Sequence, residues 1–353
     1  LVNGGDEIVG GMVDKILNGK AKNNTEYCMT PNGAFFRKDI KGFLPELMEN
    51  MYNDRVKYKK LMLEAKQEYE NTKNPKILKD ISRYDNIQMA KKISLNSAYG
   101  AIGNNWFRYF DLLVATAITT SGQLSIRWIE KSLNIHLNKI LETDNVDYVI
   151  ASDTDSVYIT FDKLVIKLFP EGTPTEKIIN FLDKIATEKL EPFIDKSYQS
   201  LAKEMNAYEQ KMEMGREAIA DKGIWTAKKR YILNVWDMEG VRFKEPYLKI
   251  MGIEAVKSST PAPCREKIKQ ALKIIMSGSE EELNNFIQEF RSQFMKLDAK
   301  LIAYPRSCNG VKKFTGENKL FASGAPIHVK GAILYNHCIR ENKLENKYPL
   351  IQE

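Results

Sequence analysis

Cysteine and histidine are both scarce in this chain of 353 residues. The four cysteines lie far apart and form no CxxC motif; they are Cys28, Cys264, Cys308 and Cys338. This spacing argues against a disulfide framework and against a structural zinc site, and it is typical of a reducing cytoplasm. The three histidines show no metal-ligand spacing either, so the sequence does not favour chemistry based on histidine.

Long apolar runs are missing as well. No run reaches the length of a membrane span, and the first residues, LVNGGDEIVGG, lack a signal-peptide pattern and an initiator methionine. We therefore expect no membrane partner, and we expect the chain to be a piece of a longer one. The excess of 53 lysines and arginines over 46 aspartates and glutamates favours a polyanionic partner only mildly. With 43% hydrophobic residues, the chain can bury a core in two or three lobes.

Two long helical patterns follow one another at residues 45–70 and 77–99. The polar segment NTKNPK between them predicts an antiparallel hairpin with arms about 35 Å long. Further helices are predicted over residues 115–141 and 175–206 and after Pro261.

Two of these later helices show an apolar face. In 115–141 the face predicts core packing beneath a sheet, and its members are Ile118, Ile126, Ile129, Leu133 and Leu137. After the capping-box pattern of Ser279 and Glu282, a second buried face is predicted at Leu283, Phe286, Ile287, Phe290 and Phe294.

A pair of carboxylates, Asp153 and Asp155, lies between two strand-like runs at 147–150 and 157–161, where a hairpin should turn. One interpretation is that the acidic and hydroxyl residues are ordinary turn formers. A calcium EF-hand loop is excluded, because Tyr158 stands where that loop needs glycine. The other interpretation is a site for Mg²⁺, which binds one or two carboxylates and would relieve their mutual repulsion.

Basic residues gather at two further places. Lys92, Asn96 and Tyr99 share one face of the second helix, and Arg55 and Lys59 share a face of the first. If the two faces meet, they form a groove that a triphosphate would fit; otherwise they are solvated surfaces.

The second place is KKRY, residues 228–231, which enters a strand before a predicted turn at 237–240. Bases beside an aromatic residue can follow a phosphate backbone, or they can simply protect a sheet edge from aggregation.

Together and in this order, KKISLNSAYG, DTDSVY and KKRY resemble the KxxxNSxYG, DTDS and duplex-contacting motifs of the family B DNA polymerases. The flanking text, for example NSAYGAIGNNWFRYFDLLVATAITTSGQ, is similar to the replicative polymerases of the T-even-like phage branch. The resemblance covers nearly the whole chain and becomes weaker near 163–200 and 296–325. It implies an α+β protein with the right-hand polymerase architecture, in the cytoplasm of a host cell if the protein is viral.

In that architecture, residues 1–42 and 105–252 would be an antiparallel-sheet palm, 43–104 helical-hairpin fingers, and 253–353 an incomplete, partly helical thumb. Template-directed DNA synthesis would use two Mg²⁺ ions, with Mn²⁺ as a substitute, and primer–template DNA and dNTPs as substrates. The implied catalytic and metal-binding residues are Asp155 and Asp153, with Glu217 as an auxiliary metal ligand. The implied dNTP-binding residues are Arg55, Lys59, Lys92, Asn96 and Tyr99. The implied DNA-binding residues are Lys228, Lys229, Arg230 and Tyr231.

The chain departs from the family pattern in several ways. No DxxSLYPS segment, which carries the family's other catalytic aspartate, and no exonuclease domain occur here, so we expect a separate or missing chain to supply them. Met214-Gly215-Arg216-Glu217 replaces Met-Asp-Arg-Glu, and the C-terminal tail that would bind a sliding clamp is absent. A catalytically silent DNA-binding fragment and a DxD-type glycosyltransferase are the alternative interpretations.

Overall fold

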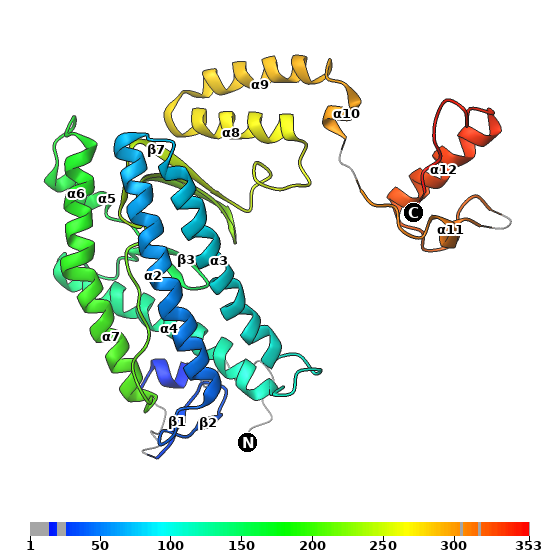
Figure 1. The fold of residues 1–353 in the computed structure, drawn as a ribbon. Helices are drawn as coiled ribbons and strands as arrows, with labels where there is room; N and C mark the ends of the chain where they lie inside the picture. The colour runs from blue at the N-terminus through cyan, green and yellow to red at the C-terminus, as the bar shows by residue number, and fades with distance from the viewer. Residues whose placement is uncertain (1–13, 20–25, 304–305, 317–318, 353) are drawn as a thin grey trace. The chain divides into compact units, whose positions relative to one another are not determined.

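The computed structural model describes residues 14–19, 26–303, 306–316 and 319–352. The chain divides into two compact units, Leu1–Met251 (unit 1) and Gly252–Glu353 (unit 2). Helices alternate with small antiparallel sheets in unit 1, and unit 2 is helical where it is described (Figure 1). This mixture confirms the predicted α+β class.

Unit 1 contains these elements in chain order: β1 (Cys28–Met29), β2 (Phe35–Phe36), α2 (Phe43–Thr72), α3 (Ile77–Ile102), α4 (Leu112–Ile140), β3 (Val149–Asp153), β4 (Ser156–Ile159), α5 (Asp162–Leu168), α6 (Thr175–Ile185), a π-helical turn (Ala186–Leu190), α7 (Glu191–Glu204), β5 (Ala218–Ala227), β6 (Arg230–Met238) and β7 (Val241–Met251). Unit 2 contains α8 (Ala262–Ser277), α9 (Glu280–Phe294), α10 (Ala299–Ile302), α11 (Val311–Phe314) and α12 (Ile327–Glu341). No helix among the described residues has the length and apolar character needed to cross a membrane.

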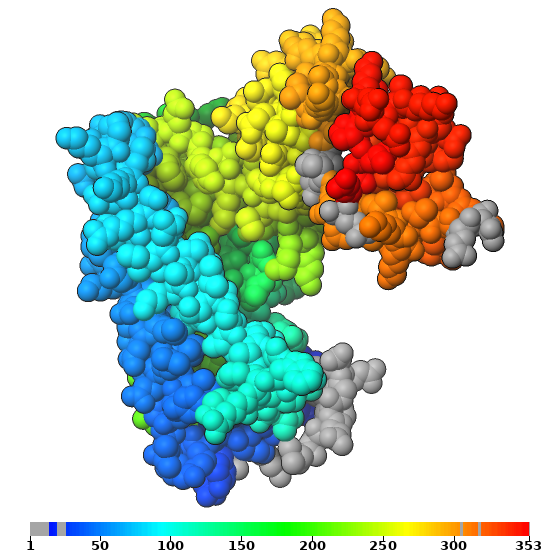
Figure 2. Space-filling view, turned by 45° about the vertical axis from the view of Figure 1, so that its right-hand side comes forward, coloured from blue at the N-terminus to red at the C-terminus, as the bar shows by residue number. Residues whose placement is uncertain are grey.

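The two longest neighbouring helices, α2 and α3, pack side by side as the predicted hairpin (Figures 1 and 2). Helix α2 ends at Thr72. The next residue, Lys73, takes a left-handed conformation (φ 53°) and donates its N–H to the Tyr69 carbonyl. Across the hairpin, the Lys91 ammonium lies 2.8 Å from the Asp54 carboxylate. The loop chemistry and the long polar helices therefore give the antiparallel pair that the sequence predicts.

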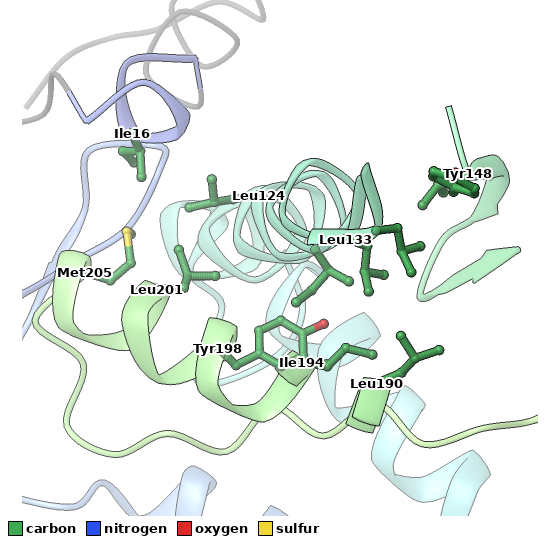
Figure 3. Packing of buried hydrophobic residues seen from close by; sticks show 12 residues of the cluster. Ile16, Leu124, Leu133, Tyr148, Leu190, Ile194, Tyr198, Leu201 and Met205 are labelled. Atoms are coloured by element: carbon green, nitrogen blue, oxygen red, sulfur yellow. The ribbon is translucent and has the colours of Figure 1, made fainter. Parts of the chain in front are cut away.

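The main core of unit 1 lies between α4 and α7 and is closed by residues that lead into β3 (Figure 3). In Figure 3, Leu124 and Leu133 of α4 lie on the side of the cluster opposite Tyr198 and Leu201 of α7. The predicted core face of α4 is confirmed at Ile129, Leu133 and Leu137. Ile118 is 46% exposed and lies outside the cluster, whose first member from α4 is Leu124.

The segment predicted as one helix over 175–206 is interrupted in the middle. Residues Ala186–Leu190 form a π-helical turn between α6 and α7. Pro192 stands in the first turn of α7 and has no N–H to donate, so the regular i→i−4 ladder cannot run through it. The proline thus explains the interruption.

The described strands form two two-stranded antiparallel sheets, β1–β2 and β3–β4, and a three-stranded meander, β5–β6–β7. Sequence analysis predicted one turn in the meander region, at 237–240, and that turn joins β6 to β7. It missed β5 and the second turn, Lys228–Lys229, which joins β5 to β6. Because β6 lies between these turns, they stand at opposite ends of the strand.

Unit 2 pairs α8 with α9 and places α11 against α12. The predicted capping box is confirmed: the Ser279 N–H donates to Glu282 and the Glu282 N–H to the Ser279 hydroxyl. The predicted buried face of α9 is wrong, because no α9 residue is buried and Ile287 is 46% exposed. On that face the Lys267 ammonium lies over the Phe286 ring, 5.3 Å from its centroid.

Candidate active site

The two candidate metal-binding aspartates stand at the tip of the β3–β4 hairpin. Asp153 ends β3 and pairs with Ser156, so Thr154 and Asp155 make the turn. Thr154 has a left-handed backbone (φ 60°), and the Asp155 N–H donates to the Asp153 carbonyl at 2.7 Å. The predicted hairpin turn is confirmed, and it leaves the Asp155 side chain exposed.

A lysine from the meander meets this tip. Lys229 lies in the β5–β6 turn, and its ammonium donates to the Asp153 carboxylate at 2.7 Å and to the Thr154 hydroxyl at 2.9 Å. The hydrogen bond from Lys229 lowers the pKa of Asp153 below its usual value of 3.8. Two motifs that are 76 residues apart in sequence, the acidic pair and KKRY, are therefore brought together.

Three aromatic rings fasten the hairpin to the meander. Tyr158 of β4 packs edge-on against Trp225 and Tyr231, with ring centroids 5.3 and 5.5 Å apart. Tyr231 is 4% exposed, so its side chain can act on a DNA ligand only through the residues that it supports. Burial raises the pKa of the Tyr231 hydroxyl, and the hydrogen bond with Tyr158 and the charges of Asp153 and Glu217 raise it further.

Glu217, the candidate auxiliary ligand, precedes β5. Its carboxylate pairs with the Lys249 ammonium at 2.6 Å, and its side chain is 50% exposed. Its charge and that of Asp153 both act on Tyr231, so the two acids share one electrostatic environment.

The donor set at the hairpin tip matches a hard divalent cation. Asp153 and Asp155 provide the one or two carboxylates with which a protein usually holds Mg²⁺. No group of three or more acidic, histidine or cysteine side chains suited to a metal occurs within the described ranges. The site therefore offers an aspartate pair and no third neighbouring acid among the described residues.

A buried ion cluster, which sequence analysis missed, lies where β6 meets β7. Asp237 is 1% exposed and accepts hydrogen bonds from the guanidinium groups of Arg216 and Arg242 and, at 3.0 Å, from the Gly240 N–H. Arg216 also pairs with Asp183 of α6 at 2.8 Å. The cluster thus ties the segment that precedes β5, helix α6 and the β6–β7 turn together. In the sequence, Asp237 could be recognised only as the first residue of the predicted turn at 237–240.

The candidate triphosphate-binding residues on α2 are partly engaged. The Lys59 ammonium forms an ion pair with the Glu239 carboxylate in the β6–β7 turn. The Nε atom of Arg55 is buried and has no hydrogen-bond partner. An unsatisfied buried guanidinium nitrogen is costly, and an anionic ligand could satisfy it.

The candidate residues on α3 are exposed. Lys92, Asn96 and Tyr99 all lie at the surface, and it is Lys91 that crosses to α2. Among the described residues, no hydrogen bond or ion pair joins the α2 and α3 candidates to Asp153 or Asp155. The structure therefore assembles the acidic pair with KKRY, but not with the basic helical faces.

Comparison with known proteins decides the family. Residues 9–188 match the sequence model of the family described as DNA polymerase family B. The chain belongs to that family. It is 36% identical over 366 residues to the DNA-directed DNA polymerase of Escherichia phage RB69, an alignment that covers 90% of this chain and 40% of the phage protein.

Two further relatives agree. The DNA-directed DNA polymerase of Enterobacteria phage T4 is 33% identical over 369 residues, covering 90% of this chain and 41% of that protein. The DNA polymerase delta catalytic subunit of Schizosaccharomyces pombe is 31% identical over 158 residues, covering 43% of this chain and 13% of that protein. These matches confirm the predicted family and its phage branch, and they leave no room for the glycosyltransferase alternative. The family B chain thus spans about 40% of the length of its two phage relatives.

Proposed function

We propose that the chain supplies the palm, the fingers and part of the thumb of a DNA-directed DNA polymerase with right-hand architecture. Residues 1–42, of which 1–13 and 20–25 lie outside the described residues, and 105–252 form the palm, 43–104 the fingers and 253–353 the thumb. The polymerase adds deoxynucleotides from dNTPs to the 3′ end of a primer on a template. The observation that carries this proposal is the meeting of Asp153 with Lys229, which places an acidic pair beside a basic turn.

Each side of this meeting has a separate role. Asp155 and Asp153 would hold Mg²⁺, and Glu217 would support them only once it is released from Lys249. Two such ions would supply activation of the primer hydroxyl and charge stabilisation of the leaving pyrophosphate. Lys229, together with Lys228 and Arg230, contacts the phosphates or base edges of the primer–template duplex. The exposed Asp155 is free to take a ligand, whereas Lys229 keeps Asp153 ionised when no other cation is near.

The helical hairpin supplies the nucleotide site. Arg55, Lys59 and Lys92 hold the triphosphate, and Asn96 and Tyr99 lie against the nascent base pair. The buried Nε atom of Arg55 lacks a hydrogen-bond acceptor, which an anionic ligand would supply. The α3 residues are exposed and therefore accessible to a nucleotide. Unit 2 carries sixteen lysines and arginines against eleven aspartates and glutamates, a surplus that is consistent with a thumb contacting DNA phosphates.

Primer extension tests the proposal. The chain is assayed alone and together with a polypeptide that carries the DxxSLYPS segment of the palm, since the two-metal reaction needs acids on both sides of the ions. We expect little extension by the chain alone and synthesis after complementation. Asp155→Asn should then lower the rate on the order of a thousandfold, equal to about 4 kcal/mol.

The matched control is Asp221→Asn, which removes an exposed carboxylate from β5 of the same unit. It should leave synthesis unchanged, and both variants should bind primer–template DNA within a few-fold of wild type. DNA binding without synthesis in every mixture would instead identify a catalytically silent DNA-binding fragment. Synthesis that survives Asp155→Asn would refute the metal-ligand assignment.

A further inference from the structure

The carboxylate of Glu239, in the β6–β7 turn, forms an ion pair with the ammonium group of Lys59. The side chains of Lys59 and Glu239 are 34% and 28% exposed, so the ion pair is partly shielded from water. A partly shielded pair is screened less by salt than a fully exposed one. The Lys59 cation, which α2 would contribute to the proposed nucleotide site, is therefore already paired with a carboxylate of the protein itself.

The turn that presents Glu239 is rigid. Glu239 and Gly240 both take left-handed backbone conformations, with φ values of 52° and 86°. The Glu239 N–H donates to the Glu217 carbonyl at 2.6 Å, and the Gly240 N–H donates to the buried Asp237 carboxylate. Because its backbone is fixed on both sides, the turn presents the Glu239 side chain from a defined position.

A second contact holds α2 against the same turn. The Arg242 N–H donates to the Gln67 side-chain oxygen at 2.9 Å. Gln67 lies eight positions after Lys59, so both side chains project from one face of α2. The figures show α2 and the start of β7 close together at one end of the helical hairpin (Figures 1 and 2).

This arrangement keeps Lys59 away from the aspartate pair. The turn with Glu239 and the turn with Lys229 are at opposite ends of β6, a strand of nine residues and thus about 26 Å long. That length is several times the length of a triphosphate group. Lys59 can bind a nucleotide that reacts at Asp155 only after it leaves Glu239 and α2 moves away from this turn.

We propose that Glu239 is a positioning residue that competes with the triphosphate of the incoming nucleotide for Lys59, and thereby weakens apparent nucleotide affinity. The inference rests on the proposed nucleotide-binding role of Lys59. A fraction of molecules with Lys59 on Glu239 is not competent to bind, and the apparent dissociation constant rises in inverse proportion to the competent fraction. For a partly exposed ion pair we expect an effect of about three- to fivefold.

The test separates KM from kcat for dNTP in the complemented polymerase. Glu239→Gln should lower KM about three- to fivefold and leave kcat unchanged. Glu239→Asp, which keeps the charge, should restore most of the wild-type KM. Glu245→Gln, which removes an exposed carboxylate from β7, is the matched control and should change neither parameter.

A double-mutant cycle with Lys59→Ala tests the mechanism. Lys59→Ala should raise KM. Adding Glu239→Gln to it should have no further effect, because the ammonium group for which Glu239 and the nucleotide compete is then absent. A KM unchanged by Lys59→Ala alone would show that Lys59 is no nucleotide ligand, and it would count against the proposed function of Lys59. A normal Lys59→Ala effect combined with an inert Glu239→Gln would overturn only the role of Glu239.

Direct nucleotide binding provides a readout that does not depend on catalysis. In the 353-residue chain itself, titration calorimetry with dNTP should give a dissociation constant about three- to fivefold lower for Glu239→Gln than for wild type, because the Lys59 ammonium is then unpaired. Glu245→Gln should bind dNTP like wild type. Equal affinities of the Glu239→Gln and wild-type chains would contradict the competition.

Discussion

Replacement of Asp237 by alanine should destabilise unit 1 more than any single change at its surface. Asp237 is 1% exposed and compensates two guanidinium groups, and its loss leaves both of them close to one another. Breaking a buried ion pair by removing one partner costs about 3–5 kcal/mol. Asp183 still neutralises part of the charge of Arg216, so we expect the lower end, about 3 kcal/mol.

Urea unfolding followed by tryptophan fluorescence measures this loss. All four tryptophans lie in unit 1, and Trp236 is the chain neighbour of Asp237, so the signal reports this unit alone. Asp237→Asn keeps the shape of the side chain and an acceptor for the Gly240 N–H, and it should fall between wild type and Asp237→Ala. Asp221→Ala, with an exposed carboxylate that pairs only with Asn234 among the described contacts, should cost less than about 1 kcal/mol. Equal losses for Asp237→Ala and Asp221→Ala would refute the claim that the cluster holds the turn.

Three further predictions concern the contact between the β3–β4 hairpin and the meander, the packing within β5, and a histidine on α4. Lys229→Met should return the pKa of Asp153 toward its usual 3.8, as measured by carboxyl NMR titration, and it should weaken primer–template binding; an unchanged pKa would deny the contact. Gly223→Ala should displace Trp225, since a Cβ there would lie 2.7 Å from the indole ring, and a wild-type near-UV spectrum would argue otherwise. Burial lowers the pKa of His136 below 6.5, so the unfolded chain binds more protons and stability falls as the pH drops below about 6.5 toward the folded pKa. His136→Phe should remove that part of the pH dependence of urea unfolding, and a persistent slope would assign it to other groups.

The hairpin of α2 and α3 could be predicted from the sequence because its signals are local. The apolar spacing, Pro45 and the polar loop all lie within the hairpin itself, and the observed helix bounds differ from the prediction by at most three residues. The acidic tip of β3–β4 was predictable for the same reason. Strand β5 was not, because its text, AIADKGIWTA, mixes charge and glycine and pairs with β6 through three register shifts.

The partners of the candidate site residues could not be predicted from the sequence, because they depend on tertiary packing. Nothing in the text of KKRY indicates that Lys229 meets Asp153, or that Tyr231 is buried under Tyr158. Likewise, the sequence indicated only that Glu239 belongs to a turn. Its ion pair with Lys59 becomes visible only when α2 packs against that turn in the structure. Contacts across 76 or 180 residues follow from the arrangement of elements rather than from local pattern.

The left-handed turns have a consequence for protein engineering. Thr154, Lys229 and Glu239 are side-chain-bearing residues with φ values of 60°, 59° and 52°, each of which costs about 1 kcal/mol relative to glycine. Glycine at any of the three would relax the backbone and raise thermal stability, but it would delete a contact at the acidic tip or at the α2 docking point. A screen for thermostable variants should therefore enrich glycine at these three turns. Under the proposed roles, a screen for polymerase activity should remove glycine at Thr154 and Lys229, whereas it should tolerate glycine at Glu239, because loss of that carboxylate releases Lys59. At the acidic tip, backbone stability and the proposed function therefore favour different residues.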